Sequence, residues 1–479
     1  MPFQTLDMRL SDGLTVVVGP NGSGKTSLAR LLDLVSRAVV ACSTGDWTDI
    51  TSKYGAAGRY GARRWQVRVG LIFDGDDEVS LLDDWARTAL AAAIAGIKQE
   101  LVEQNERLLT TELGTAAVLG SGELVVEHDD RRQQPWSVVW RSSPAGVDVQ
   151  MDLSSGNRIG PYPGADKGTA LNDVTDWLRQ QGDSLAAPAV ATGPSTATLI
   201  EVVQRVDFEL VARISGGLTE APCMQRVLDR LGPMPANRTV VTLSQVYSHL
   251  LASRVLVTAN RREPVRTMFR AADLAAAPDL TSGSGVGLAL WQDKNGDAVA
   301  RMSFAETREV FTALTGVDLN VQTQSINTTS EESQLLLAPI VSEASFVDIP
   351  LRLAGAGREE AAFLAVLLSR PHDVLVLDEP ATNLSAAAQR QLLSRLRQRA
   401  VHGQQTIVIT HSAHLVPAST PADLASVVRL TRNAAGTTVH RPSATPADFF
   451  RLRTLLRPAD VRDLLFASGV CAVGRPDRT

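Results

Sequence analysis

The sequence has few cysteines, few aromatic residues and no long apolar run. Its three cysteines, Cys42, Cys223 and Cys471, are far apart and lack metal-ligand spacing, which argues against a disulfide framework and against a zinc module. No segment approaches the roughly 18 consecutive apolar residues that a membrane span needs. Asp7 and Arg9 lie where a signal peptide would need its apolar core. We therefore expect a cytoplasmic protein without a membrane partner.

The composition, 44% hydrophobic and 21% charged over 479 residues, is typical of a globular chain with two or three domains. The net charge of −5 is unevenly distributed, because residues 351–479 contain 16 arginines, no lysine and 10 acidic residues. A basic lobe suits phosphate backbones such as DNA. Solvated arginines on helix faces are the alternative, and "RLRQRA" at residues 395–400 fits an exposed helix equally well.

The most informative motif is "VVVGPNGSGKTSLARLL" at residues 16–32, which satisfies the phosphate-loop pattern G-x-x-x-x-G-K-[ST]. The apolar run at residues 14–18 predicts a buried strand, and the spacing after the loop predicts a helix. Glycines let backbone amides surround a phosphate at a helix N-terminus. We expect Lys25 to reach the β- and γ-phosphates of ATP and Thr26 to bind Mg²⁺. The predicted ATP-binding residues are Gly19, Pro20, Asn21, Gly22, Ser23, Gly24, Lys25, Thr26 and Ser27.

A second glycine-rich stretch, "TSGSGVG" at residues 281–287, lacks a lysine, and we expect it to be a flexible loop.

The acidic partner of the phosphate loop is predicted in "HDVLVLDEPATNL". Residues 374–377 should form a strand that ends at Asp378 and Glu379, where ligands bind in parallel α/β sheets. We expect Asp378 to hold Mg²⁺ and Glu379 to orient and deprotonate the attacking water. A further strand at residues 406–409 leads to His411, which we expect to sense or stabilise the transferring γ-phosphate.

Because 353 positions separate Lys25 from Asp378, the predicted sheet must contain a large insertion. We predict an α/β fold with the first part of a nucleotide-binding domain at residues 1–75, a mainly helical inserted region at 76–350, the second part at 351–450, and a tail at 451–479. The insertion should begin with a long helix near residues 83–113, too short for a long coiled-coil arm. A β-meander should follow, and then helices near 170–181 and 199–231.

Together, "GPNGSGKTSL", "LAGAGREEAAFLAVLL", "VLVLDEPATNL" and "VITHSAHL" resemble the head of ABC-type ATPases, most closely the OLD (overcoming lysogenization defect) family and related SMC-like AAA family ATPases. The resemblance implies a homodimer or higher homo-oligomer in which ATP lies between the phosphate loop of one head and the signature of the other. The signature residues would be Gly355, Ala356 and Gly357.

The sequence departs from that family pattern at two positions. The usual signature serine is absent, and Ser385 replaces the aspartate that typically ends the D-loop. Gln66 is a weak Q-loop candidate, for which an ordinary strand residue is the alternative. "VLVTANRREP" also resembles the middle of OLD-type ATPases, with Arg261 and Arg262 either binding phosphate or forming a surface pair.

The end of the chain resembles the lead-in to the Toprim nuclease domain of full OLD proteins, but Gly474 falls near the expected metal-binding glutamate. We therefore predict no nuclease activity in this chain. A lost or separate nuclease, a fragment of a longer protein, and an unrelated terminal helix and strand remain open explanations.

The leading hypothesis is an ATPase that regulates nucleic-acid processing with a separate effector such as a nuclease, as in anti-phage defence. This last part depends on family analogy. The alternatives are an ATP-binding subunit of an ABC transporter and a non-hydrolysing ATP-sensing scaffold.

Overall fold

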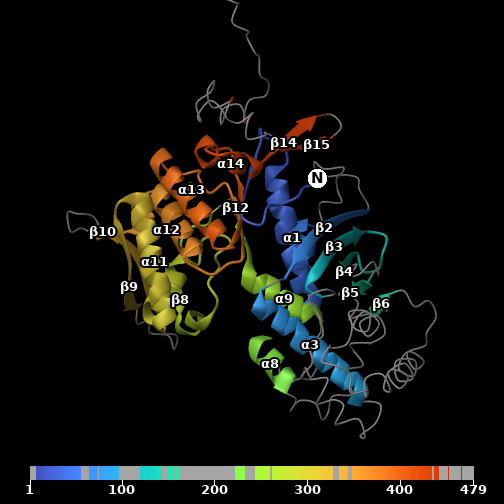
Figure 1. Ribbon diagram of the computed structural model, residues 1–479. Helices are drawn as coiled ribbons and strands as arrows, with labels where there is room; N and C mark the ends of the chain where they lie inside the picture. Colours follow the sequence, from blue (N-terminus) through green and yellow to red (C-terminus); the bar gives the residue numbers. More distant parts are fainter. Residues whose placement is uncertain are drawn as a thin grey trace, which may run out of the picture. The chain divides into compact units, whose positions relative to one another are not determined.

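The computed structural model describes residues 7–54, 64–73, 75–95, 119–142, 149–154, 158–160, 222–231, 243–258, 262–326, 334–342, 348–433 and 436–441, with the single positions 451 and 465. The chain divides into two compact units (Figure 1). Unit 1 contains Met1–Leu32 and Arg254–Thr479, and unit 2 contains Asp33–Ser253. These limits lie at other positions than the predicted domain borders at 75 and 350.

Unit 1 is built on a six-stranded sheet in the order β15-β14-β1-β13-β12-β7. All its strand pairs are parallel except that of β14 with β15, so the predicted α/β class is confirmed. The strands are β1 (Leu14–Val18), β7 (Val255–Val257), β12 (Val374–Asp378), β13 (Gln405–Ile409), β14 (Val427–Asn433) and β15 (Gly436–His440). Strand β7 comes from the middle of the predicted inserted region.

The three predicted strands of the nucleotide-binding fold lie side by side in this sheet. Val17 of β1 and Asp378 of β12 are both in register with Ile409 of β13. The strand bodies are buried apolar runs, as expected for a parallel sheet covered on both faces. Because the three strands end at one level, the polar residues that follow them gather at one edge of the sheet.

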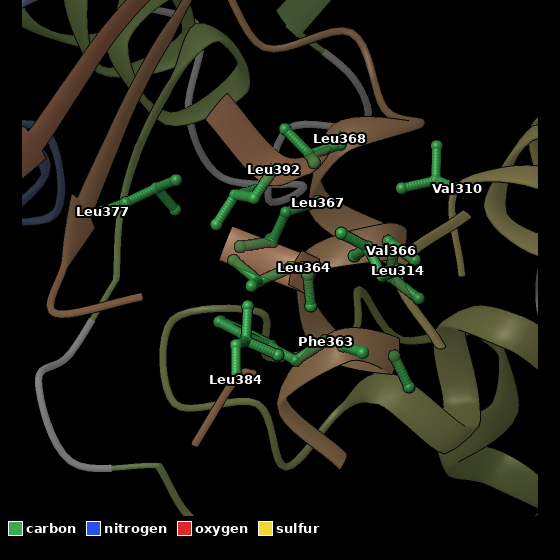
Figure 2. Packing of buried hydrophobic residues seen from close by; sticks show 14 of the residues in the cluster. Val310, Leu314, Phe363, Leu364, Val366, Leu367, Leu368, Leu377, Leu384 and Leu392 are labelled. Carbon is green, nitrogen blue, oxygen red and sulfur yellow. The ribbon is translucent and has the colours of Figure 1, made fainter. Parts of the chain in front are cut away.

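Helix α12 (Ala356–Leu368) lies at the centre of the core of unit 1, and every residue from Glu360 to Leu368 is buried. Figure 2 shows its leucines packed with Val310 and Leu314 of α11 (Ala298–Thr315) and with Leu392 of α13 (Ala386–Val401). The other helical elements of unit 1 are the start of α1 (Lys25–Thr44), η5 (Ala271–Ala275), α10 (Val286–Asn295), η6 (Leu351–Leu353), η7 (Ala413–Leu415) and α14 (Pro421–Ala425).

A second, antiparallel sheet of unit 1 has the order β11-β10-β8, with β9 also paired to β10. Its strands are β8 (Met268–Arg270), β9 (Asp318–Ile326), β10 (Gln334–Ser342) and β11 (Asp348–Pro350). Together with β7, α10 and α11, it shows that much of the predicted inserted region belongs to the same compact unit as the phosphate loop.

The arginines at residues 395–400 have partners within unit 1. Arg395 pairs with Glu309 at 2.6 Å, and Arg397 pairs with Asp423 at 2.7 Å. Arg399 is buried and donates to the carbonyl oxygens of Leu368 (2.9 Å) and His372 (3.0 Å). The expectation of a solvated helix face is therefore wrong for Arg399, because its guanidinium donates hydrogen bonds to backbone carbonyls at and just after the end of α12.

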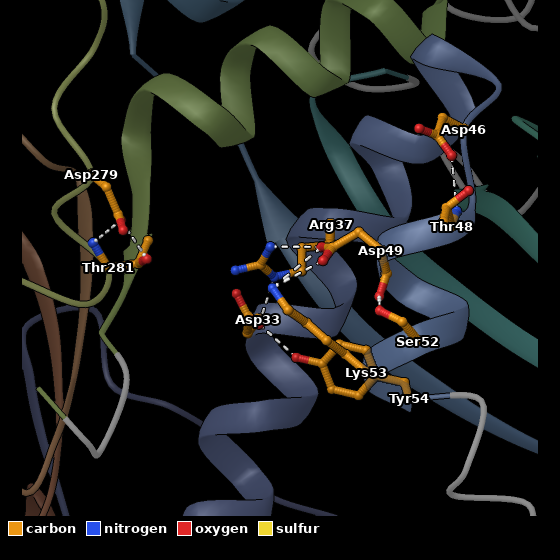
Figure 3. A network of polar contacts seen from close by, with 10 residues as sticks. All are labelled: Asp33, Arg37, Asp46, Thr48, Asp49, Ser52, Lys53, Tyr54, Asp279 and Thr281. Carbon is orange, nitrogen blue, oxygen red and sulfur yellow. Dashed lines mark hydrogen bonds and ion pairs between the residues drawn. The ribbon is translucent and has the colours of Figure 1, made fainter. Parts of the chain in front are cut away.

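The glycine-rich stretch at residues 281–287 is a hydrogen-bonded turn rather than the expected flexible loop. Asp279 accepts a hydrogen bond from the Thr281 amide at 2.9 Å (Figure 3). It also accepts one from the Ser282 hydroxyl at 2.8 Å. A side chain at Gly283, whose φ is +91°, would lie 3.2 Å from the ring of Phe363. Helix α10 begins at Val286, within this stretch.

Unit 2 contains a five-stranded antiparallel sheet in the order β2-β3-β4-β5-β6, which confirms the predicted meander. Its elements, besides the end of α1, are α2 (Thr48–Tyr54), β2 (Arg64–Ile72), α3 (Asp76–Ala95), β3 (Ser121–Asp129), β4 (Trp136–Ser142), β5 (Val149–Asp152), β6 (Arg158–Gly160), α8 (Pro222–Leu231) and α9 (Leu243–Arg254). The predicted helix at 83–113 is observed up to residue 95 and that at 199–231 from residue 222. The rest of both, the helix at 170–181 and most of the tail at 451–479 lie outside the described residues.

A network of polar side chains joins α1 to α2 within unit 2 (Figure 3). Arg37 binds Asp33 at 2.7 Å and Asp49 at 2.8 Å, and the Tyr54 hydroxyl also donates to Asp33. Because three of these groups are at least partly withdrawn from solvent, the network fixes α2 against α1. Within the described part of the chain, every helix is too short or too polar to cross a membrane.

Candidate functional site

The predicted phosphate loop joins β1 to α1 and needs glycine at three positions. Gly19, Gly22 and Gly24 have φ values of +154°, +79° and +103°. Residues that carry a Cβ atom rarely adopt such values. Gly19 is also constrained by space, because a Cβ atom there would lie 2.2 Å from the carbonyl oxygen of Leu430. The loop is therefore wrapped against the start of the β14–β15 hairpin.

Contacts from within the loop and from the hairpin hold this shape. Lys25 is buried, and its ammonium donates to the carbonyl oxygens of Gly19 at 2.7 Å and Pro20 at 3.2 Å. Thr437 donates to the carbonyl of Ser23 at 3.1 Å. Burial lowers the pKa of Lys25, while the carboxylates of the two acidic residues after β12 oppose this shift. A positive charge is thus held where the loop curls around the helix N-terminus.

Asp378 lies at the carboxyl end of β12 and is almost fully buried. Its Oδ1 atom has no hydrogen-bond partner among the described residues. Burial and the neighbouring Glu379 raise the pKa of Asp378 to about 6, although the charges of Arg262, Arg30 and Lys25 oppose the shift. A buried carboxylate oxygen without a protein partner, close to a lysine, is suited to a cation.

Glu379 has the only positive φ, +51°, among the non-glycine residues that the structure describes. This conformation costs on the order of 1–2 kcal/mol for an L-residue. The backbone is held there because the Glu379 amide donates to the carbonyl of Ile409 at 2.8 Å. Strained residues of this kind cluster at functional sites, and the strain here turns the Glu379 side chain toward the end of β13.

His411 contacts Glu379 through two of its atoms. Its Nδ1 lies 2.7 Å from Glu379 Oε2, and its backbone amide donates to the same oxygen at 3.2 Å. The imidazole is largely exposed whereas the Glu379 carboxylate is mostly covered. The structure therefore brings Lys25, Asp378, Glu379 and His411 to the carboxyl ends of three adjacent strands, as the sequence predicted.

The predicted signature residues form the start of α12. Gly355 is the N-cap, with φ of +97° and no side-chain cap, so the first amides of the helix lack a capping side chain. Gly357 allows close approach of the D-loop, since a Cβ atom there would lie 2.7 Å from the carbonyl oxygen of Asn383. Ala356 is the first helical residue. Backbone amides at such a helix end can bind an anion.

The D-loop position that departs from the family pattern has a local structural role. Ser385 caps α13 by accepting a hydrogen bond from the Ala388 amide at 3.2 Å. Gln389, one turn further, donates to the carbonyls of Ala381 (3.2 Å) and Leu384 (2.8 Å) and accepts from the Ser412 hydroxyl. Gln389 thus connects the D-loop to Ser412, the residue that follows His411.

Two residues that follow β7 contact parts of the site, and sequence reasoning missed the first of them, Thr258. The Thr258 hydroxyl accepts a hydrogen bond from the Asp378 amide at 3.2 Å. Arg262 is only 16% exposed and pairs with Glu360 of α12 at 3.3 Å, so the surface alternative is wrong for Arg262; Arg261 lies outside the described residues. The available signal for Thr258 was its place directly after the apolar run of β7, a position comparable to that of Asp378 at the end of β12. Gln66, the weak Q-loop candidate, lies in β2.

The site residues fit a magnesium-bound polyphosphate. The donor set of one buried carboxylate and one hydroxyl is too small for a protein-only metal centre, and the described residues contain no cluster of three or more metal-ligating side chains. A Mg²⁺ ion characteristically takes its remaining ligands from phosphate and water. Thr26 and Asp378 are the residues that would hold it.

The sequence is similar over short segments to ATP-binding proteins of ABC transporters. A zinc import ATP-binding protein of Pseudomonas fluorescens is 36% identical over 77 residues, which are 15% of this chain and 29% of that protein. A putative ABC transporter ATP-binding protein of Halobacterium salinarum is 46% identical over 59 residues, 12% of this chain and 25% of that protein. The chain thus matches less than a third of the length of these relatives. No protein-family model matches it.

Solved structures of SMC heads are similar at a low level. An SMC head bound to the C-terminal winged-helix domain of ScpA has a TM-score of 0.39 and 12% identity, covering 92% of this chain and 93% of that chain. The SMC head domain of Thermotoga maritima has a TM-score of 0.28 and 11% identity, covering 91% and 93%. Such scores do not by themselves establish a shared fold.

The strand order and the glycine loop define the fold. The chain has an α/β P-loop fold, and its sequence similarity to ATP-binding proteins of ABC transporters covers short segments only.

Proposed function

We propose that this protein is an ABC/SMC-type ATPase that binds Mg²⁺-ATP, hydrolyses it to ADP and phosphate, and dimerises around it. The observation that carries the proposal is the convergence of Lys25, Asp378 and Glu379 at the carboxyl ends of β1 and β12, which both pair with β13. The charges of these residues act on one another across the sheet edge. Phosphoryl transfer depends mainly on such positioning and on electrostatic stabilisation.

Each residue has one role in this proposal. Lys25 leaves the loop carbonyls and binds the β- and γ-phosphates. Thr26 and Asp378 hold Mg²⁺, which when bound neutralises phosphate charge. Glu379 orients the attacking water and accepts its proton, and His411 fixes the Glu379 carboxylate beside the γ-phosphate. The amides of the loop from Gly19 to Ser27 surround the phosphates.

The proposed dimer follows from the position of the signature helix. The uncapped start of α12, with Gly355, Ala356 and Gly357, offers amides to an anion. In the resembling ATPases this helix end binds the nucleotide of a second head, so a second copy of this chain would supply it. Regulation of nucleic-acid processing, DNA binding and a separate effector nuclease in anti-phage defence belong to the proposal through that resemblance alone.

A transporter subunit is the second candidate, and one observation favours it. The local relatives are named as ATP-binding proteins of zinc import and other ABC transport systems. In this alternative the same ATP site would drive a membrane partner instead of a nucleic-acid effector.

Nucleotide binding and turnover test the central proposal. Lys25→Ala should weaken ATP binding, measured by calorimetry, by about tenfold or more, or roughly 1.4 kcal/mol. Unchanged affinity would refute the assignment of the loop. Glu379→Gln should keep ATP, stop turnover and shift the chain to a dimer in light scattering.

DNA binding at increasing salt separates the two candidate functions. Arginine contacts to phosphate release counterions, so DNA affinity should fall steeply between low and high salt. Salt-independent binding to membranes that contain a co-expressed permease would favour the transporter alternative.

A further inference from the structure

Arg262 is a buried cation that the proposed chemistry leaves without a role. Its side chain is 16% exposed, its Nε lies 3.3 Å from Glu360 Oε1, and its Nη1 and Nη2 atoms are buried without hydrogen-bond partners among the described residues. The guanidinium also lies over the ring of Phe363, 4.4 Å from its centroid. An arginine normally uses its planar fork fully when it is buried. Here one side of the fork is paired and the other side is not.

The two carboxylates that act on Arg262 belong to different parts of the proposed ATPase machinery. Glu360, only 4% exposed, lies in α12, five residues after the N-cap Gly355. Asp378 is the proposed metal ligand, and its ionised form is stabilised by the charge of Arg262. Burial lowers the pKa of Arg262, and both carboxylates oppose that shift. The charge of Arg262 therefore interacts both with Glu360 of the signature helix and with Asp378 of the proposed metal site.

Two described residues near Arg262 in the sequence are hydrogen-bonded to other segments of unit 1. Thr258, at the end of β7, accepts a hydrogen bond from the Asp378 amide. Glu263, directly after Arg262, donates its amide to the carbonyl of Ser282 at 2.9 Å. Its stacking partner Phe363 packs against Gly283 of the same turn. The Arg262 side chain can therefore shift relative to Glu360 while Glu263, the residue that follows it, stays hydrogen-bonded to Ser282.

We propose that Arg262 is a positioning residue that reports the occupancy of the Asp378 site to the signature helix α12. Without a divalent cation, Arg262 shares its charge between Asp378 and Glu360. When a divalent cation binds Asp378, the two cations repel each other, and Arg262 shifts fully onto Glu360 and Phe363. The start of α12 is then held in one position, which prepares it for the second head. This inference rests on the proposed ATP function.

Hydrogen exchange of the full-length chain tests this coupling. The protein is incubated with a non-hydrolysable ATP analogue, with either Mg²⁺ or a chelator, and exchange is followed in peptides covering residues 356–368. In the wild type we expect Mg²⁺ to slow exchange in these peptides several-fold. In Arg262→Gln the analogue should still bind, but the Mg²⁺-dependent slowing should be lost.

Two further variants and a matched control complete the experiment. Glu360→Gln should abolish the same Mg²⁺ response, and the double variant should show no additional loss. Arg262→Lys, which keeps the charge but not the fork, should retain a reduced response, and it serves if Arg262→Gln does not fold. Arg399→Gln is the control, because Arg399 is a buried arginine at the other end of α12 that binds only carbonyl oxygens.

The outcomes distinguish this inference from the proposed function. A wild-type-sized Mg²⁺ response in Arg262→Gln overturns the coupling, and so does an equal loss in Arg399→Gln, which would show that any damage to α12 suffices. If the analogue does not bind the wild-type protein at all, the proposed ATP function itself fails.

Discussion

The parallel sheet of unit 1 and the antiparallel sheet of unit 2 place their polar side chains in opposite ways. In β1, all five residues are buried, and all of them except Thr15 are apolar. In β2, exposed and partly buried residues alternate along the whole strand. A strand covered on both faces can carry chemistry only at its ends, whereas a strand with one open face exposes side chains along its length.

This difference explains why every predicted catalytic residue lies in unit 1. The ends of β1, β12 and β13 lie at one level. The short polar segments that follow these strands therefore lie close together. The described part of unit 2 instead offers a sheet and helices held by ion pairs such as Arg226–Asp84 at 2.6 Å. We therefore expect substitutions to affect ATP chemistry in unit 1 and mainly stability in unit 2.

The largest expected effect separates two acidic residues. Glu379→Gln should lower the rate of ATP hydrolysis by about 10²- to 10⁴-fold, because the attacking water loses its base. Glu78→Gln, at a buried position in the first turn of α3, should leave the rate within about twofold while lowering stability. Phosphate release at saturating ATP measures both. Equal losses would contradict the division of labour between the units.

A pair of core leucines tests whether the two units unfold separately. Leu364→Ala in α12 and Leu81→Ala in α3 should each destabilise their own unit by about 2–5 kcal/mol, since both side chains are fully buried. Hydrogen exchange, read peptide by peptide, shows which sheet loses protection. If either substitution loosens both sheets to the same extent, the units form one cooperative structure.

The raised pKa of Asp378 gives a pH-dependent stability effect in unit 1. Because the folded state holds the pKa at about 6, above the ordinary value of 3.8, ionisation of Asp378 costs stability as the pH rises through 4 to 6. Asp378→Asn removes this cost and should stabilise the metal-free protein by on the order of 1–3 kcal/mol above pH 6. The gain should shrink toward zero below about pH 4. Melting temperatures in chelator at pH 4, 5, 6 and 8 measure it, and a gain that is constant with pH would contradict the assignment.

The smallest expected effect concerns the arginines of α13. Arg395→Ala removes a partly exposed pair with Glu309, so it should change stability by about 0–1 kcal/mol. If α13 does not contact nucleic acid, the variant should also keep the DNA affinity and salt dependence of the parent. A loss of about one unit in the salt slope would instead place Arg395 on a phosphate.

Local structure could be predicted from the sequence where the residues that determine it lie within one short segment. Glycine at positions 19, 22 and 24, followed by Lys25, predicts a loop that the structure shows with positive φ at all three glycines. The strand before Asp378 was equally readable from its apolar run. Segments whose partners are distant were not: Arg399 looked like a surface arginine because its carbonyl partners lie at the end of another helix.

The assignment of the inserted region shows the same limit. Its helical spacing and alternation predicted helices and a meander, and the described residues contain both. Composition gave no sign that β7 adds a sixth strand beside β12, because sheet order depends on long-range pairing rather than on local pattern.

By itself, the sequence determined the elements of the ATP site: a glycine loop, a lysine, two carboxylates after an apolar strand and a histidine after the next. Each follows from local chemistry, namely backbone freedom, helix-end charge and burial of β-branched runs. Tertiary structure alone decided that Glu379 adopts a positive φ and meets His411, and that Arg262 pairs with Glu360. These contacts depend on how strands and helices far apart in the chain pack together, and packing of that kind leaves no periodic trace in the residues that take part.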